Sequence, residues 1–171
     1  MSAGLERLNR CSPQQAEAEL LPCCGSTNWA RRMAQQRPFR DLAELLQAAD
    51  SVWRDLPPED WLEAFSRHPK IGENSASPAG SARTHRWSAE EQAGTQRAGR
   101  DVIAALAEAN RVYQERFGYI FIVCATGKSS EEMLALLRNR LQNEPGEELR
   151  VAVEEQRRIT RLRLEKLLSG K

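Results

Sequence analysis

Residues 39–53 read FRDLAELLQAADSVW, and this stretch decides the fold class. Its apolar side chains recur at intervals of three and four residues, at Phe39, Leu42, Leu45, Leu46, Ala49, Val52 and Trp53. An α-helix has about 3.6 residues per turn, so this spacing places them along one face. The stretch therefore predicts an amphipathic helix whose apolar face is buried.

Helical patterns continue on both sides of this stretch. Further helices are predicted after a Ser12 cap and Pro13, after a cap at Ser26 or Thr27, and before Pro69. Others are predicted over 87–118, where Gly94 and Gly99 mark a kink or close packing, over 131–142 after a cap at Ser129 or Ser130, and from Pro145 to Leu168. The β-rich run YIFIVCA, residues 119–125, has no obvious partner strand, so it is either extended and buried or made helical by packing. We predict an all-α, single-domain bundle of seven or eight helices over residues 1–171, with one short extended segment.

Composition argues against several classes of protein. Lysine and arginine number 25 and aspartate and glutamate 24, which predicts neither nucleic-acid nor membrane-surface binding. There is no apolar run of about 18 residues, no signal-peptide pattern and no Ser-Lys-Leu ending, so we expect a cytoplasmic protein. Four cysteines, two of them adjacent, suit neither a disulfide framework nor a zinc site, and we expect reduced thiols.

His68 is the first candidate for chemistry. It precedes Pro69 where a predicted helix ends, and residues 72–86 then form a long Gly/Ser/Ala/Pro-rich loop of the kind that covers binding sites. Histidine titrates near neutral pH, so His68 is a candidate general acid or base. The alternative is a structural histidine at a helix C-terminus. His85 is expected to be solvated, and with no third ligand in pattern a metal site is not predicted.

The segment WSAEEQ, residues 87–92, is the second candidate. Ser88 and Glu91 match a capping box, which predicts that a helix begins at Ser88. Free N–H groups at such a start also bind anions, so a substrate carboxylate could lie there beside Glu91 and Gln92. A carboxylate near His68 would also orient the imidazole and favour its protonated form.

Arg163 is the third candidate, because a helical wheel of the last helix places it on the apolar side near Gln156. Burying an arginine is costly unless it has a partner. Its side chain either extends to the protein surface, where the guanidinium stays in water, or points inward and pairs with a carboxylate or an amide-like oxygen.

Together these segments resemble 2-oxo-4-hydroxy-4-carboxy-5-ureidoimidazoline (OHCU) decarboxylase, the last enzyme of the route from urate to allantoin. The matching pieces are CCGSTNWARRM, RPF, HPKIGE, WSAEEQAG, YQERFGYIFIVCATGKSSEEML, RLQNEPGEEL and ITRLRLEKLL, in this order between Cys23 and Leu168. The family commonly has arginine after its His-Pro pair, where this chain has Lys70. That change is neutral for a solvated cation but not for a bidentate contact.

The resemblance implies an all-α, cofactor-free, usually dimeric enzyme that converts OHCU to (S)-allantoin and CO2. It implies that His68 is catalytic, assisted by Glu91 and Arg163. It implies substrate contacts from Pro69, Ser88, Gln92, Phe121, Val123, Cys124, Ala125, Thr126 and Gly127. Two other readings stay open: a non-enzymatic helical interaction module, and the same fold acting on another small ureide acid.

Overall fold

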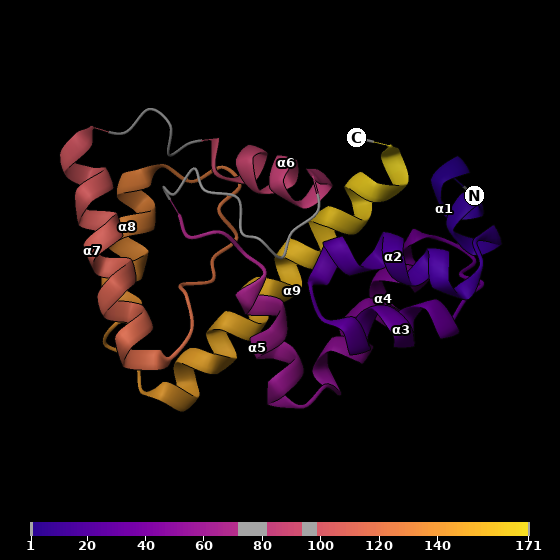
Figure 1. The fold of residues 1–171 in the computed structure, drawn as a ribbon, viewed down its shortest axis with the longest axis horizontal. Coiled ribbons are helices and arrows are strands. Elements are labelled where there is room, and N and C mark those ends of the chain that lie inside the picture. Colours follow the sequence, from indigo (N-terminus) through magenta and orange to yellow (C-terminus); the bar gives the residue numbers. More distant parts are fainter. Residues whose placement is uncertain (1, 72–81, 94–98, 171) are drawn as a thin grey trace. The chain divides into compact units, whose positions relative to one another are not determined.

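The computed structural model describes residues 2–71, 82–93 and 99–170, and within these ranges it contains nine helices (Figure 1). Their bounds are α1 Ala3–Arg10, α2 Pro13–Cys24, α3 Thr27–Gln35, α4 Leu42–Arg54, α5 Pro58–Ser66, α6 Ala82–Glu91, α7 Arg100–Phe117, α8 Ser130–Arg140 and α9 Pro145–Ser169. The all-α prediction is confirmed, with slightly more helices than the predicted seven or eight. The chain divides into two compact units: a first unit of residues 1–64 with 156–171, and a second unit of residues 65–155.

The first unit contains the stretch that decided the fold class. Helix α4 starts at Leu42, where the Asp41 side chain accepts the Glu44 N–H at 2.8 Å as an N-cap. Leu45, Leu46, Ala49, Val52 and Trp53 are buried, as their spacing predicted, whereas Leu42 is 40% exposed. Helices α2 and α3 pack side by side in this unit (Figure 1). Ser12 and Ser26 cap them as N-cap residues, in agreement with the sequence.

Helix α1 was not predicted. Ser2 is its N-cap residue, and Leu5 and Leu8 on one face of the helix are buried. The burial of this one apolar face stabilises the two-turn helix. Both chain ends belong to the first unit (Figure 1), and the Gly4 backbone approaches that of Leu168 closely. A Cβ atom at position 4 would lie 2.1 Å from the Leu168 carbonyl oxygen, which is closer than any real contact.

We therefore expect Gly4→Ala to lower the free energy of unfolding by about 1–3 kcal/mol, the usual cost of overpacking. Gly146→Ala is the matched control, because a Cβ atom there meets nothing within 4 Å and alanine favours the helix. Urea unfolding of both variants measures the difference. Equal stability of the two would show that the ends do not touch.

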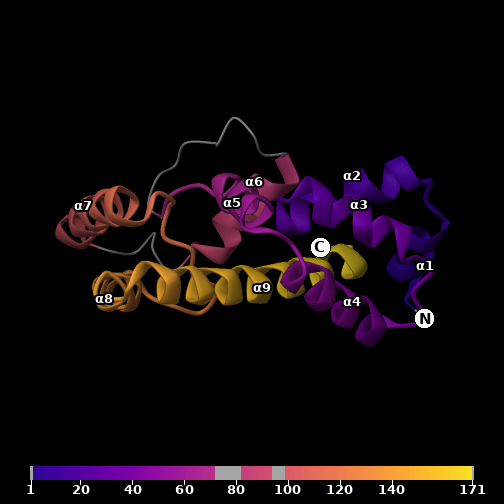
Figure 2. The same cartoon turned by 90° about the horizontal axis from the view of Figure 1, so that it is seen from below.

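The second unit is built on α7 and α8, which lie side by side in both ribbon views (Figures 1 and 2). Gly118 ends α7 with a left-handed φ of 83°, and residues 120–125 that follow are not helical. Alternate residues of the segment, Phe121, Val123 and Ala125, join one buried cluster with residues of α7 and α8. That alternation has the period of two of an extended chain, so the first of the two readings of YIFIVCA is correct.

The predicted helix over 87–118 is right for residues 87–91 and 100–117 but wrong as a single element. The structure has α6 ending at Glu91 and α7 beginning at Arg100, with residues 94–98 outside the described ranges. The predicted loop over 72–86 is also wrong in part, because 82–86 belong to α6, while 72–81 lie outside the described residues. The error over 82–86 arose because the serine pattern at Ser88 was taken as a helix start.

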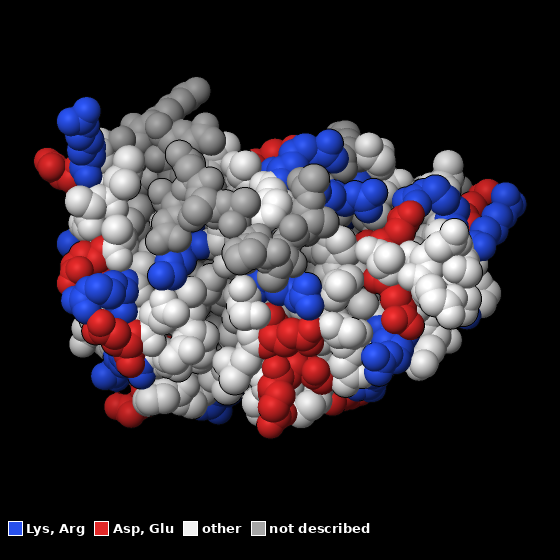
Figure 3. All heavy atoms as spheres, viewed as in Figure 1, with Lys and Arg blue, Asp and Glu red and all other residues white. Residues whose placement is uncertain are grey.

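Charge is mixed on the face seen in Figure 3, where both acidic and basic side chains are present. This matches the near-balance of 25 basic and 24 acidic residues. Among the helices of the described ranges, none combines the length and apolarity that crossing a membrane requires.

Candidate functional site

His68 follows the C-terminal end of α5, and its backbone N–H donates to the Phe65 carbonyl at 3.2 Å. Its side chain is half-buried. The helix ends before Pro69, as the sequence predicted, because a residue preceding proline disfavours helical geometry.

Two neighbours anchor the His68 segment to the extended segment. The Phe65 ring packs against Tyr119 with centroids 5.3 Å apart, and Ile71 belongs to the same buried cluster as Phe121 and Val123. Three residues of chain span at most about 10 Å, so His68 is tethered on both sides close to residues 119–123. Packing within the second unit thus brings the histidine segment and the extended segment together.

Ser88 and Glu91 lie in the last turn of α6 rather than at a helix start. The Gln92 N–H donates to the Ser88 carbonyl at 3.0 Å, and Ser88 is 4% exposed. The capping-box prediction and the anion site at a helix N-terminus are therefore wrong. The C-terminal end of a helix presents carbonyl groups and a negative dipole end, which disfavour an anion.

Glu91 nevertheless lies near the extended segment. Burial raises the pKa of the Cys124 thiol, and the negative charges of Glu155 and Glu91 raise it further, against the opposing effect of Lys128. The charges of Glu155, Glu91 and Lys128 are therefore close enough to Cys124 to affect its thiol. Among them, the Glu155 carboxylate accepts the Cys124 N–H at 2.7 Å, and the Lys128 Nζ donates to its carbonyl at 2.8 Å.

The remaining substrate contacts implied by the resemblance continue along the same chain. Phe121, Val123 and Ala125 are buried, and Thr126 and Gly127 form the turn that follows them. Gly127 has a φ of 79°, and the Lys128 N–H closes the turn on the Ala125 carbonyl at 3.0 Å. Pro69 and Gln92 are half-buried. Whether these residues bind substrate stays a prediction.

Arg163 belongs to the first unit, where it is 2% exposed and its Nη1 donates to the Pro22 carbonyl at 3.2 Å. The side chain points inward, as the helical wheel indicated, and the alternative that it extends to the protein surface is wrong. Burial raises the pKa of the neighbouring Cys24 thiol to about 12, although the positive charge of Arg163 opposes this. Participation of Arg163 in one site with His68 and Glu91 stays a prediction.

Sequence reasoning missed a buried ionic cluster in the second unit, formed by Tyr113, Arg140, Asn143 and Glu148. Glu148 is 0% exposed and accepts from Arg140 Nε at 2.8 Å, from Asn143 at 2.9 Å and from the Tyr113 hydroxyl. Burial, followed by the bond to Glu148, raises the pKa of Tyr113. No local rule pairs Arg140 with Glu148, because Arg140 lies at the end of α8 and Glu148 lies in the first turn of α9. The only sequence signal is that both fall on otherwise apolar faces.

Arg140 also supports the extended segment directly. Its Nη1 donates to the Ile122 carbonyl at 2.6 Å, and its guanidinium carbon lies 4.5 Å from the centroid of the Phe121 ring. A cation over an aromatic face is attracted by the ring quadrupole. The cluster therefore fixes the segment that the resemblance assigns to substrate binding.

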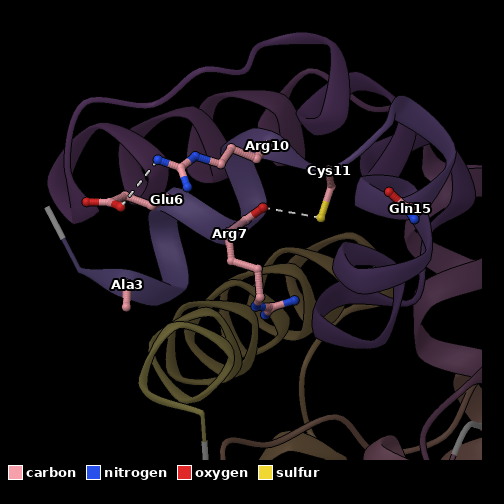
Figure 4. Close-up of a pocket in the computed structure, with 6 residues that line it drawn as sticks. All are labelled: Ala3, Glu6, Arg7, Arg10, Cys11 and Gln15. Atoms are coloured by element: carbon pink, nitrogen blue, oxygen red, sulfur yellow. Dashed lines mark hydrogen bonds and ion pairs between the residues drawn. The ribbon is translucent and has the colours of Figure 1, made fainter.

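The first unit has a shallow surface pocket of about 470 Å³ beside α1 (Figure 4). Its lining includes Glu6 and Arg10, which form an ion pair, and Cys11, whose thiol donates to the Arg7 carbonyl. None of the predicted site residues lines it. Among the described residues, no group of three or more His, Cys, Asp or Glu side chains is placed to hold a metal ion.

Known proteins are similar to this chain in sequence and fold. The sequence model of the family described as OHCU decarboxylase matches residues 9–165. The Arabidopsis thaliana protein "Uric acid degradation bifunctional protein TTL" is 40% identical over 156 residues, covering 91% of this chain and 48% of that protein. The Amia calva "2-oxo-4-hydroxy-4-carboxy-5-ureidoimidazoline decarboxylase" is 42% identical over 65 residues, 38% of this chain and 37% of that protein. The chain thus spans about half the length, or less, of these curated relatives.

A solved structure agrees with the sequence comparisons. The crystal structure of OHCU decarboxylase in the presence of (S)-allantoin has a TM-score of 0.77 and 36% identity, covering 88% of this chain and 97% of that one. Fold and motif order define an all-α protein of the OHCU decarboxylase type. The chain belongs to the OHCU decarboxylase family.

Proposed function

We propose that this chain catalyses the decarboxylation of OHCU to (S)-allantoin and CO2 in urate degradation, without a cofactor. One observation carries the proposal: the match, in sequence and fold, to an OHCU decarboxylase crystallised in the presence of (S)-allantoin. The family model supports the proposal as well, because its match over residues 9–165 spans the segments around His68, Glu91, the extended residues and Arg163. The proposal makes the chain a carboxy-lyase.

The chemistry defines what the site has to do. When the carboxylate of OHCU leaves as CO2, its bonding electron pair moves from the hydroxyl-bearing carbon into the adjacent C=N, whose nitrogen takes up a proton, and an enol results. The enol O–H proton then leaves to form a carbonyl, and the former C=N carbon, which bears the ureido group, takes up one proton, which must arrive on one face to give the (S) product. A rigidly held proton donor satisfies that requirement.

His68 is proposed as the general acid or base that moves this proton. It is half-buried and tethered beside the extended segment. In such a place an imidazole can be held in one orientation and can still exchange its proton with water. Glu91 is proposed to set its charge and orientation, since a nearby carboxylate favours the imidazolium form. Arg163 is proposed to pair with polar edges of the substrate through its planar guanidinium.

Substrate binding is proposed to use Pro69, Ser88, Gln92 and the segment from Phe121 to Gly127. We also propose a single domain, because the family match over 9–165 runs through both compact units. A homodimer, a cytoplasmic location and the lack of nucleic-acid or membrane partners stay predictions of the sequence.

The test uses OHCU made freshly from urate by the two preceding enzymes of the route. We expect the chain to accelerate loss of OHCU and the appearance of the circular dichroism signal of (S)-allantoin. The same mixture without the chain gives the spontaneous rate. A rate no faster than that control would refute the proposal and favour an interaction module. A panel of other small ureide acids tests the remaining alternative.

A further inference from the structure

In the part of the chain that the structure describes, side chains bond to the extended segment along one edge. Within the described residues, Arg140 donates to the Ile122 carbonyl and Lys128 donates to the Cys124 carbonyl. The Cys124 N–H donates to the Glu155 carboxylate. In an extended chain, the N–H and C=O of one residue point to the same edge, and those of the next residue to the other. Ile122 and Cys124 are two apart, so all three bonds lie on the same edge.

This arrangement has a consequence for the opposite edge. The peptide groups of Phe121 and Val123 point there, away from the three charged side chains. The side chains of Phe121 and Val123 are buried in the cluster with α7 and α8, so the segment cannot rotate about its own axis without losing that burial. Burial fixes the face of the segment that carries the Phe121 and Val123 side chains, and the bonds to Ile122 and Cys124 fix the edge that meets the charged side chains.

We propose that Glu155 is a positioning residue of this site: by holding the Cys124 N–H, it aims the Phe121 and Val123 peptide groups toward the substrate. The inference rests on the proposed function. Glu155 is half-buried near the middle of α9, a helix of 25 residues, so its carboxylate is presented from a rigid support. Arg140 does the same at Ile122, but it is also half of a buried ion pair, so its removal would disturb folding.

Replacing Glu155 separates its hydrogen bond from its charge. Glu155→Ala removes both, and we expect kcat/KM for OHCU to fall by about ten- to a hundredfold, as small misplacements of a site do. Glu155→Gln keeps an oxygen that accepts the Cys124 N–H, and we expect kcat/KM to stay within about threefold of wild type, since the peptide remains oriented. Glu147→Ala, an exposed glutamate two turns earlier on α9, is the matched control and should behave as wild type.

A second readout does not depend on turnover. In a Cys11→Ser background, the described thiols other than Cys124 are buried, so alkylation by iodoacetamide reports on Cys124. The Glu155 charge raises the pKa of that thiol. Glu155→Ala and Glu155→Gln should therefore both move the pH profile of alkylation to lower pH, and Glu147→Ala should not.

The outcomes are distinct. Wild-type kcat/KM in Glu155→Ala, or equal losses in Glu155→Ala and Glu155→Gln, would overturn the positioning role while leaving the proposed function intact. An unchanged alkylation profile would show that Glu155 does not lie beside Cys124 and would also overturn it. A wild-type chain that does not act on OHCU would overturn the proposed function, and the catalytic part of this inference with it.

Discussion

His68→Asn is expected to lower the turnover of OHCU by about a hundredfold or more, the contribution typical of a positioned general acid or base. Asparagine is similar in size and still forms hydrogen bonds, but it does not titrate near neutral pH. The loss should therefore appear in kcat rather than in KM, since the pocket keeps its shape. Stopped-flow measurement on freshly generated OHCU separates the two constants.

The pH profile gives the same prediction a second readout. If His68 carries the proton, one limb of the wild-type profile reports its titration, and that limb should be lost in the variant. His85→Asn is the matched control, because it makes the same change at the other histidine of the chain, on α6. It should keep wild-type turnover. Wild-type turnover in His68→Asn with normal folding would return His68 to a structural role.

Glu148→Gln is expected to lower the free energy of unfolding by about 3–5 kcal/mol, the cost of breaking a buried ion pair from one side. Glu148 is fully buried, and the Arg140 side chain is 7% exposed. A neutral amide leaves the guanidinium of Arg140 without a counter-charge in an apolar surrounding. Because proteins are stable by only about 5–15 kcal/mol, a loss of this size should be evident in urea unfolding.

Two further variants test the cause of that loss. Glu144→Gln removes an exposed carboxylate four residues earlier and should change stability by less than about 0.5 kcal/mol, as surface substitutions do. Adding Arg140→Met to Glu148→Gln removes the orphaned charge and should recover part of the lost stability. A Glu148→Gln variant as stable as Glu144→Gln would show that the pair does not support the second unit.

The two predictions concern different properties of the second unit, its chemistry and its stability. His68 is tethered to the extended segment by Phe65 and Ile71, and Arg140 holds that segment at Ile122. A loss of Glu148 should therefore lower stability and, through Arg140, disturb the extended segment, whereas a loss of His68 should lower activity without lowering stability. Measuring both properties in both variants distinguishes a structural effect from a chemical one.

The sequence by itself determined the elements that local rules govern. Spacing in FRDLAELLQAADSVW gave α4, serine caps gave the starts of α2, α3 and α8, and Pro69 marked the end of α5. The inward direction of Arg163 also followed from a helical wheel. Caps, turns and periodicity depend on residues within about four positions of one another, so they can be read along the chain.

Only the tertiary structure decided where Ser88 and Glu91 lie and what holds the extended segment. The pattern Ser-x-x-Glu fits a helix start, yet the buried neighbours Trp87 and Ser88 belong to the end of α6. Arg140 meets Glu148 and Ile122, and Glu155 meets Cys124, across separations of 8 to 31 residues. Such pairs form because packing buries these groups together and an unpaired buried polar group is costly, a condition set by the whole fold.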